Sequence, residues 1–252
     1  MFDLRLIRAD ALKLHRRYGM LAMSLLLTVG MAVLVFAVEI IQHADNPLKH
    51  DPAGGLHSYQ GAISFLTVMV FIVAAIVGST AGAQDIETGV FRDLAATGRS
   101  RIALFGSRIP GAMAIVLPIA ALVAALTGIV GVTLAGSLAA PSAGAIAGGT
   151  AALLASGALG CFVAVGLAAL IGSRGPVIAI VLGFELAISP LLSSIGFLGD
   201  IRQALPANAL DRIANQAHRG VAVALGTAIV VLIAWAAAAF AAGAWRTRTH
   251  EI

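Results

Sequence analysis

The chain has 252 residues, of which 60% are hydrophobic and only 11% charged, and its mean hydropathy is +0.98. Soluble domains average about 45–50% apolar and about 25% charged residues, so this composition excludes an ordinary soluble protein. The net charge of +4 does not indicate nucleic-acid binding, because the basic residues gather at the ends of apolar runs. We therefore expect an integral membrane protein.

The apolar runs are continuous, whereas the strands of a membrane-spanning barrel alternate apolar and polar residues. A helix needs about 20 apolar residues to cross the hydrocarbon core. The sequence thus predicts an all-α integral membrane protein, built as one transmembrane domain over residues 1–252. Six runs are long enough to span: 19–41, 62–83, 109–136, 144–171, 176–195 and 221–245.

The segment before the first span has the pattern of an amphipathic helix over residues 1–18. Its apolar residues recur at helical spacing, and most of its basic residues lie off that stripe. The stripe contains Leu4, Ile7, Ala11, Leu14 and Tyr18, and the basic residues off it are Arg5, Arg8, Lys13 and Arg16. We expect an interfacial elbow helix, with its apolar side in the acyl boundary and its basic side at anionic headgroups.

The distribution of basic residues predicts the orientation. With the N-terminus in the cytoplasm, the inner segments hold 12 of the 16 Lys and Arg residues and the outer segments hold the other 4, namely Lys49, Arg202, Arg212 and Arg219. Positive charge concentrates on the cytoplasmic side of membrane proteins, so both termini are expected there.

The outer segments contain no convincing site. His43, His50 and His57 lie in the segment 42–60, but prolines and glycines break any helix that would align them, so a solvated loop is favoured over a metal site. The segment 196–220 is interrupted by Pro206 and predicts a pair of short re-entrant or interfacial helices.

Small residues recur at four-residue spacing in two spans. Gly78 and Gly82 form a GxxxG element, and Ala152, Ser156 and Gly160 follow the same spacing in the fourth run. Small faces allow helices to approach closely in lipid. Packing within the chain and dimerisation both fit this pattern.

No constellation for catalysis, metal binding or cofactor binding is visible. None of the six runs contains a histidine, and Cys161 is the single cysteine. A nucleotide-binding P-loop needs a Gly-Lys pair, but the only lysines, Lys13 and Lys49, follow leucines. We predict no enzymatic activity in this chain, and any ATP must be bound by another subunit.

Glu185 is the unusual charge, because it lies near the middle of the fifth run. A carboxylate at this depth costs several kcal/mol unless it faces a cavity or a partner. Two interpretations stay open here: a pathway residue that binds a cation or a proton, and a structural residue bonded within a helix contact.

The stretch 84–94 reads QDIETGVFRDL and continues as AATGRSRIALFGSR to residue 108. It resembles the membrane subunits of type-2 ABC exporters, the ABC-2-type permeases. In that family an acidic residue precedes Gly-Thr, a short amphipathic helix, a Ser-Arg turn and a basic residue that re-enters the membrane. Here Gly89 is followed by Val90 instead, with Thr88 in front, and Leu205 to Ala209 is similar to the family's Leu-Pro-x-Asn-Ala pattern.

The resemblance implies a permease in the bacterial inner membrane that forms the translocation pathway of an ATP-driven exporter. It implies a second permease subunit, identical or related, and two cytoplasmic ABC ATPase subunits that bind ATP and Mg²⁺. A cytoplasmic coupling helix between spans two and three would contact the ATPase. The expected interface residues are Asp85, Glu87, Thr88, Gly89, Phe91, Arg92, Asp93, Arg99 and Arg101.

The resemblance also implies that spans two and five line the pathway. This would place Ser79, Thr80 and Glu185 where cargo passes. Two other functions fit the sequence: a proton-coupled secondary transporter that uses Glu185, and a membrane anchor for a cytoplasmic partner.

Overall fold

The computed structural model describes residues 4–90, 98, 100–215 and 221–249, and within these ranges it consists of helices joined by short connections. Six of the described helices are long and apolar enough to cross a membrane. The all-α prediction and the number of spans are confirmed. The six are Tyr18–Asp45, Gly55–Glu87, Arg101–Thr133, Ala143–Ile171, Arg174–Ser194 and Leu225–Thr249.

Two of these spans are interrupted by single wide turns. The first consists of α2 (Tyr18–Leu25), a π-helical turn η1 (Leu26–Gly30) and α3 (Met31–Asp45). The fifth consists of α8 (Arg174–Gly183), a π-helical turn η2 (Phe184–Ile188) and α9 (Ser189–Ser194). The other four are α4 (Gly55–Glu87), α6 (Arg101–Thr133), α7 (Ala143–Ile171) and α11 (Leu225–Thr249).

Several boundaries differ from the predicted ones. The second span begins at Gly55 instead of residue 62, and the third begins at Arg101 instead of residue 109. The apolar run marks only the hydrocarbon-crossing part, whereas backbone hydrogen bonds carry the helix on through polar residues. The third span ends early, at Thr133, shortly before the left-handed backbone of Gly136 (φ 56°). The sixth begins at Leu225 rather than residue 221.

Helix α4 forms the centre of the bundle and packs most extensively on α7. A Cβ atom on Gly82 would come within 2.5 Å of the Ala168 Cβ, and one on Gly160 would come within 2.6 Å of the Ala74 Cβ. The hydroxyl of Ser156 donates to the Thr67 carbonyl oxygen at 2.7 Å and joins the same two helices. The small-residue pattern therefore serves packing inside the chain.

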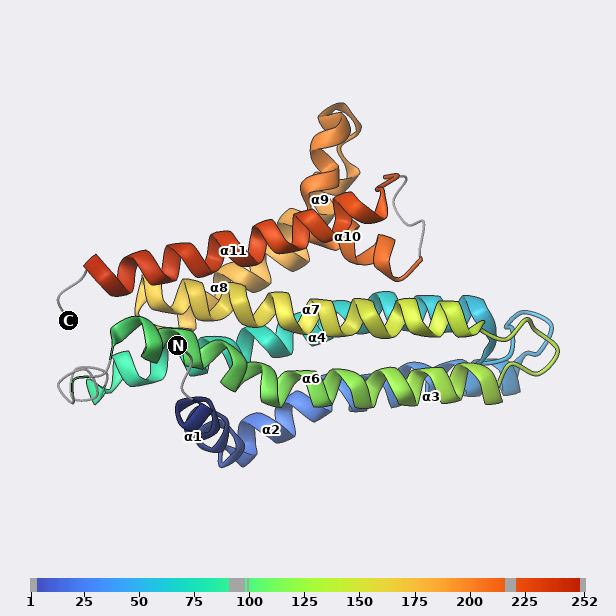
Figure 1. Cartoon of the computed structure of the whole chain (residues 1–252). Helices are drawn as coiled ribbons and strands as arrows, with labels where there is room; N and C mark the ends of the chain where they lie inside the picture. Colours follow the sequence, from blue (N-terminus) through green and yellow to red (C-terminus); the bar gives the residue numbers. More distant parts are fainter. Residues whose placement is uncertain (1–3, 91–97, 99, 216–220, 250–252) are drawn as a thin grey trace.

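Both ends of the described chain lie at one end of the bundle, on the left of Figure 1. We call this the terminal end. The end of α4, the start of α6 and the connection from α7 to α8 lie there too, and the connections 46–54 and 134–142 lie at the opposite end. This arrangement agrees with an even number of spans.

Helix α1 (Leu4–His15) lies at the terminal end, across the direction of the spans, and packs against α6. Leu14 is buried in the main core, and Ala11 lies against Gly111 of α6, whose missing side chain lets the helices approach. Leu4 and Tyr18 are exposed. Part of the apolar stripe therefore faces the protein, not lipid as expected.

The segment after the fifth span folds into η3 (Gly196–Ala204), a 3₁₀ stretch kinked at Gly199 (φ 51°), and α10 (Pro206–Ile213). The expected pair of short helices is present. Figure 1 shows α9 leaving the line of α8, so that the chain projects from the side of the bundle before α10 returns to it. Helix α10 packs against α11 and α7.

Candidate functional site

The cytoplasmic-loop prediction centred on the end of α4, and there the structure places a buried charge cluster. The Asp85 carboxylate accepts from Lys13 Nζ at 2.7 Å and from Arg108 Nη2 at 3.4 Å. Arg108, 3% exposed, also donates to the Gly82 carbonyl oxygen at 2.6 Å. Asp85 thereby fastens the last turn of α4 to α1 and to α6.

A second carboxylate, that of Asp10 on α1, joins this cluster. The hydroxyl of Ser107 donates to Asp10 Oδ2 at 2.8 Å. Burial raises the pKa of Asp10 above its ordinary 3.8, against the opposing effects of the Ser107 hydrogen bond and the positive charges of Arg108 and Lys13. The folded chain therefore holds the proton of the Asp10 carboxyl more tightly than the unfolded chain does. Protonated Asp10 stabilises the fold at low pH, and this stabilisation is lost as pH rises from 3.8 through the raised pKa of the folded chain.

Glu87, the last residue of α4, joins that helix to the fifth span. Its Oε1 atom accepts from the backbone N–H of Arg174 at 2.7 Å, and its Oε2 lies 3.7 Å from Arg174 Nε. Arg174 is the first residue of α8, so the carboxylate satisfies an N–H group that the helix leaves free and lies at the positive end of the helix dipole.

We call Asp85, Glu87 and their partners Lys13, Arg108 and Arg174 the α4 junction. It ties three elements to the end of α4, immediately before the connection to α6. Of the other predicted interface residues, Thr88 and Gly89 are exposed and Arg101 is half-buried in the first turn of α6. The remaining four, Phe91, Arg92, Asp93 and Arg99, lie outside the described residues.

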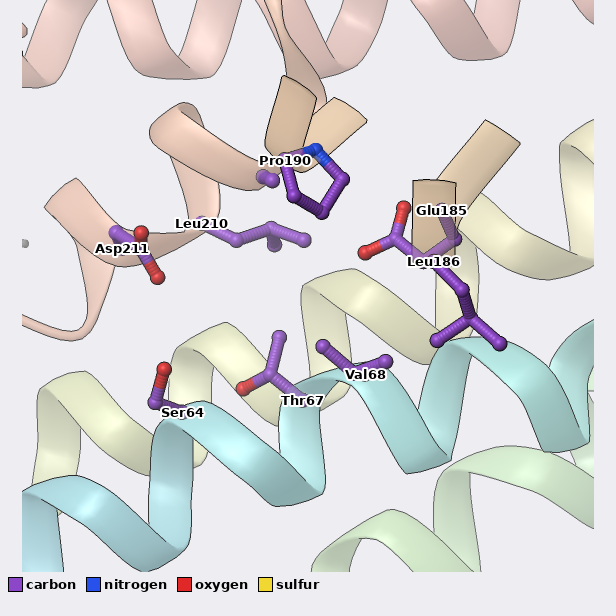
Figure 2. Close-up of a pocket in the computed structure, with 9 residues that line it drawn as sticks. Ser64, Thr67, Val68, Glu185, Leu186, Pro190, Leu210 and Asp211 are labelled. Atoms are coloured by element: carbon purple, nitrogen blue, oxygen red, sulfur yellow. The ribbon is translucent and has the colours of Figure 1, made fainter. Parts of the chain in front are cut away.

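The structure places Glu185 at a partly open cavity of about 110 Å³ lined by three elements (Figure 2). Helix α4 contributes Ser64, Thr67 and Val68. The fifth span and α10 contribute the other lining residues, which are Glu185, Leu186, Pro190, Ala207, Leu210 and Asp211. Among the described residues at this cavity, two carboxylates and two hydroxyls are thus set in an otherwise apolar wall.

The π-helical turn η2 holds Glu185 in position. Its neighbour Phe184 packs on Trp235 of α11 with ring centroids 5.5 Å apart, and the Trp235 indole donates to the Ala204 carbonyl oxygen at 3.0 Å. Glu185 itself is buried. Wide turns of this type interrupt regular helices and often occur at functional sites.

The two other predicted pathway residues do not reach this cavity. Ser79 and Thr80 are buried nearer the terminal end of α4, and both hydroxyls donate to the Ile76 carbonyl oxygen of their own helix. On α4 it is Ser64 and Thr67 that share a cavity with Glu185. The structure therefore brings α4 and the fifth span together at this cavity without Ser79 and Thr80, and the translocation pathway itself stays a prediction.

Sequence reasoning missed Asp211. The residue follows the Leu205–Leu210 stretch and belongs to a short helix that begins at Pro206, an arrangement typical of an ordinary surface helix. The one feature of the sequence that could have identified Asp211 is a carboxylate charge within a moderately apolar outer segment. The place of Asp211 at the same cavity as Glu185 depends on how α10 folds back, which no local pattern encodes.

Within the described part of the chain no group of three His, Cys, Asp or Glu side chains could hold a metal ion. The outer-segment histidines are not gathered either, and the His43 ring bonds to the His50 carbonyl oxygen at 2.7 Å.

In comparisons with known proteins, no family model matches the chain and no curated protein matches it significantly.

Proposed function

We propose that this chain is the membrane-spanning subunit of an ATP-driven exporter of the ABC-2 type. In this proposal the terminal end faces the cytoplasm of a bacterial cell. Two permease subunits form the pathway, and separate ATPase subunits that bind ATP and Mg²⁺ contact the connection between α4 and α6. The observation that carries the proposal is the α4 junction.

The junction suits the transmission of force. A motor that moves the connection after Glu87 pulls on α4, and the Asp85 ion pairs carry the displacement to α1 and α6. Glu87 carries it to the first turn of α8, which leads directly to η2 and Glu185. Packed helices joined by such contacts move as rigid elements and switch between discrete arrangements.

The exposed part of the connection supports a docking role. Thr88 and Gly89 lie at the surface, and Gly89 adopts a left-handed backbone (φ 76°) that turns the chain out of α4. The charged residues of the stretch 92–101 would steer a partner, and the apolar Phe91, Leu94 and Ala95 would form a small contact face. In this mechanism Asp85 acts from inside the permease, and Glu87 acts at its surface through its contact with Arg174.

One observation favours a second candidate, a proton-coupled secondary transporter. Glu185 and Asp211 line the same cavity, and an ionisable residue within a span, as Glu185 is, is typical of proton and ion pathways. An anchor without transport would need neither carboxylate. The two transport mechanisms differ in whether a motor subunit is bound.

The test is affinity purification of the tagged chain from its native membrane in mild detergent, followed by mass spectrometry and an ATP hydrolysis assay. We expect a stoichiometric P-loop subunit and ATPase activity, and ATP-dependent release of cargo from vesicles distinguishes an exporter from an anchor. Arg101→Glu should reduce capture of that subunit several-fold by reversing a charge beside the connection.

Lys49→Glu is the matched control, because Lys49 is an exposed base at the opposite end of the bundle. It should leave capture unchanged. Absence of any P-loop subunit after crosslinking would refute the exporter and favour the proton-coupled candidate. Equal losses with both variants would show that the connection between α4 and α6 is not the contact.

A further inference from the structure

We infer that the cavity between α4, η2 and α10 binds a small organic ammonium group, as free ligand or as the head of a larger cation. This inference deepens the proposed function by naming the chemical class of the cargo. It rests on the proposal that the chain transports a substrate along this route. The ligand-binding step itself needs no motor subunit.

The cavity has a size suited to such a group. Its volume of about 110 Å³ exceeds what one water molecule needs. A cavity of about 150 Å³ in another protein accommodates benzene, so a site somewhat smaller accommodates an ammonium nitrogen with a few carbon atoms. Ser64 and Thr67 supply oxygen atoms on the α4 side.

The lining combines carboxylate oxygens with apolar surface, and an alkylammonium requires both. Glu185 and Asp211 offer carboxylate oxygens from two different elements, and Figure 2 shows both side chains at the cavity with Leu210 between them. Val68, Leu186 and Pro190 offer apolar contact for the attached carbons. The carboxylate oxygens of the described lining can accept hydrogen bonds from an ammonium group.

A divalent metal fits this donor set poorly. Ca²⁺ takes six to eight oxygen ligands, and Mg²⁺ demands a near-ideal octahedron. The described residues provide no group of three ligating side chains here, whereas an ammonium donates only a few hydrogen bonds and is satisfied by carboxylate and hydroxyl oxygens.

Trp235 provides a reporter next to the site, because its ring packs on Phe184, the neighbour of Glu185. The chain has two tryptophans, so Trp245→Phe leaves Trp235 as the single fluorophore. The purified full chain in detergent is titrated with n-butylammonium chloride. Sodium chloride controls for ionic strength, and n-butanol is the uncharged ligand of similar shape.

We expect a saturable change in Trp235 fluorescence with butylammonium and little change with butanol. Glu185→Gln and Asp211→Asn should each weaken binding at least tenfold, since each removes a charged hydrogen-bond acceptor. Asp200→Asn is the matched control, an amide replacement at a carboxylate of η3 that does not line the cavity. It should leave the titration unchanged.

Ala207→Leu provides an independent test if a carboxylate variant fails to fold, as judged by circular dichroism and gel filtration. It fills the cavity while both carboxylates remain, and it should also abolish the saturable change. No saturable response in the parent, an equal response to butanol, or unaltered binding in the three cavity variants would each overturn the inference. If an ATPase is captured but butylammonium gives no response, the ammonium site is refuted and the exporter proposal stands. If butylammonium binds but no ATPase is captured, the exporter proposal is refuted and the ammonium site stands.

Discussion

Asp85 is the residue on which the terminal end depends most. Asp85→Asn keeps the size of the side chain but removes the negative charge beside Arg108, whose guanidinium is 3% exposed. Removing one partner of a buried ion pair typically costs about 3–5 kcal/mol, because the other charge stays buried. We expect a loss of that order in the free energy of unfolding, measured by denaturant titration of the purified chain in detergent.

Lys13→Ala is the control for this effect. The Lys13 side chain is 42% exposed, so water screens its ion pair with Asp85, and the loss should stay below about 1 kcal/mol. The double variant Asp85→Asn with Arg108→Met should recover part of the stability. A loss as large for Lys13→Ala as for Asp85→Asn would contradict the central position given to the Asp85–Arg108 contact.

At this scale the sequence identified the unusual acids but not their contacts. Asp85 and Glu87 were predicted from a resemblance to face an ATPase, and both bond within the chain. Glu185 was identified from its depth alone. Its neighbour at the cavity, Asp211, belongs to a separate helix, and no periodicity in a single sequence predicts which distant side chains meet.

Among the elements, the contact of α4 with α7 holds the bundle together through small residues. Gly82→Ala adds a methyl group that would come within 2.5 Å of the Ala168 Cβ, so the helices must separate. Overpacking of this kind costs about 1–3 kcal/mol. We expect a clear loss of thermal stability, measured by the temperature at which the detergent-solubilised chain aggregates.

Gly61→Ala is the matched control on the same helix. A Cβ atom at Gly61 has no neighbour within 4 Å, and alanine favours a helix by about 1 kcal/mol over glycine. This variant should be neutral or stabilising. The same direction of change for Gly61→Ala and Gly82→Ala would show that helix propensity, not the distance between α4 and α7, determines the result.

The number of long helices could be predicted from the sequence, but their ends and their π-helical turns could not. Continuous apolar runs locate helices, because lipid leaves the backbone no other way to satisfy its hydrogen bonds. They do not locate helix ends, so the first turns of α4 (residues 55–61) and of α6 (residues 101–108) were missed. The π-helical turn η2 was also missed, and its Phe184 packs on Trp235 of a distant helix, a contact that no local pattern predicts.

For the whole molecule, the arrangement of its two ends provides a prediction about orientation. Both ends of the described chain, the end of α4 and the starts of α6 and α8 lie at the terminal end, and these segments hold most of the described basic residues. The opposite end has few. Because Lys and Arg are retained on the cytoplasmic side, the terminal end should face the cytoplasm.

Cysteine labelling in spheroplasts measures this orientation directly. The native Cys161 is fully buried in α7, so it contributes no background and can stay in place. Thr88→Cys and Ser137→Cys place exposed thiols at the terminal and opposite ends. A membrane-impermeant maleimide should modify the Ser137→Cys variant in intact spheroplasts and the Thr88→Cys variant only after permeabilisation. The reverse pattern, or labelling of both variants in intact spheroplasts, would contradict the orientation and remove the basis for a cytoplasmic motor at the α4 junction.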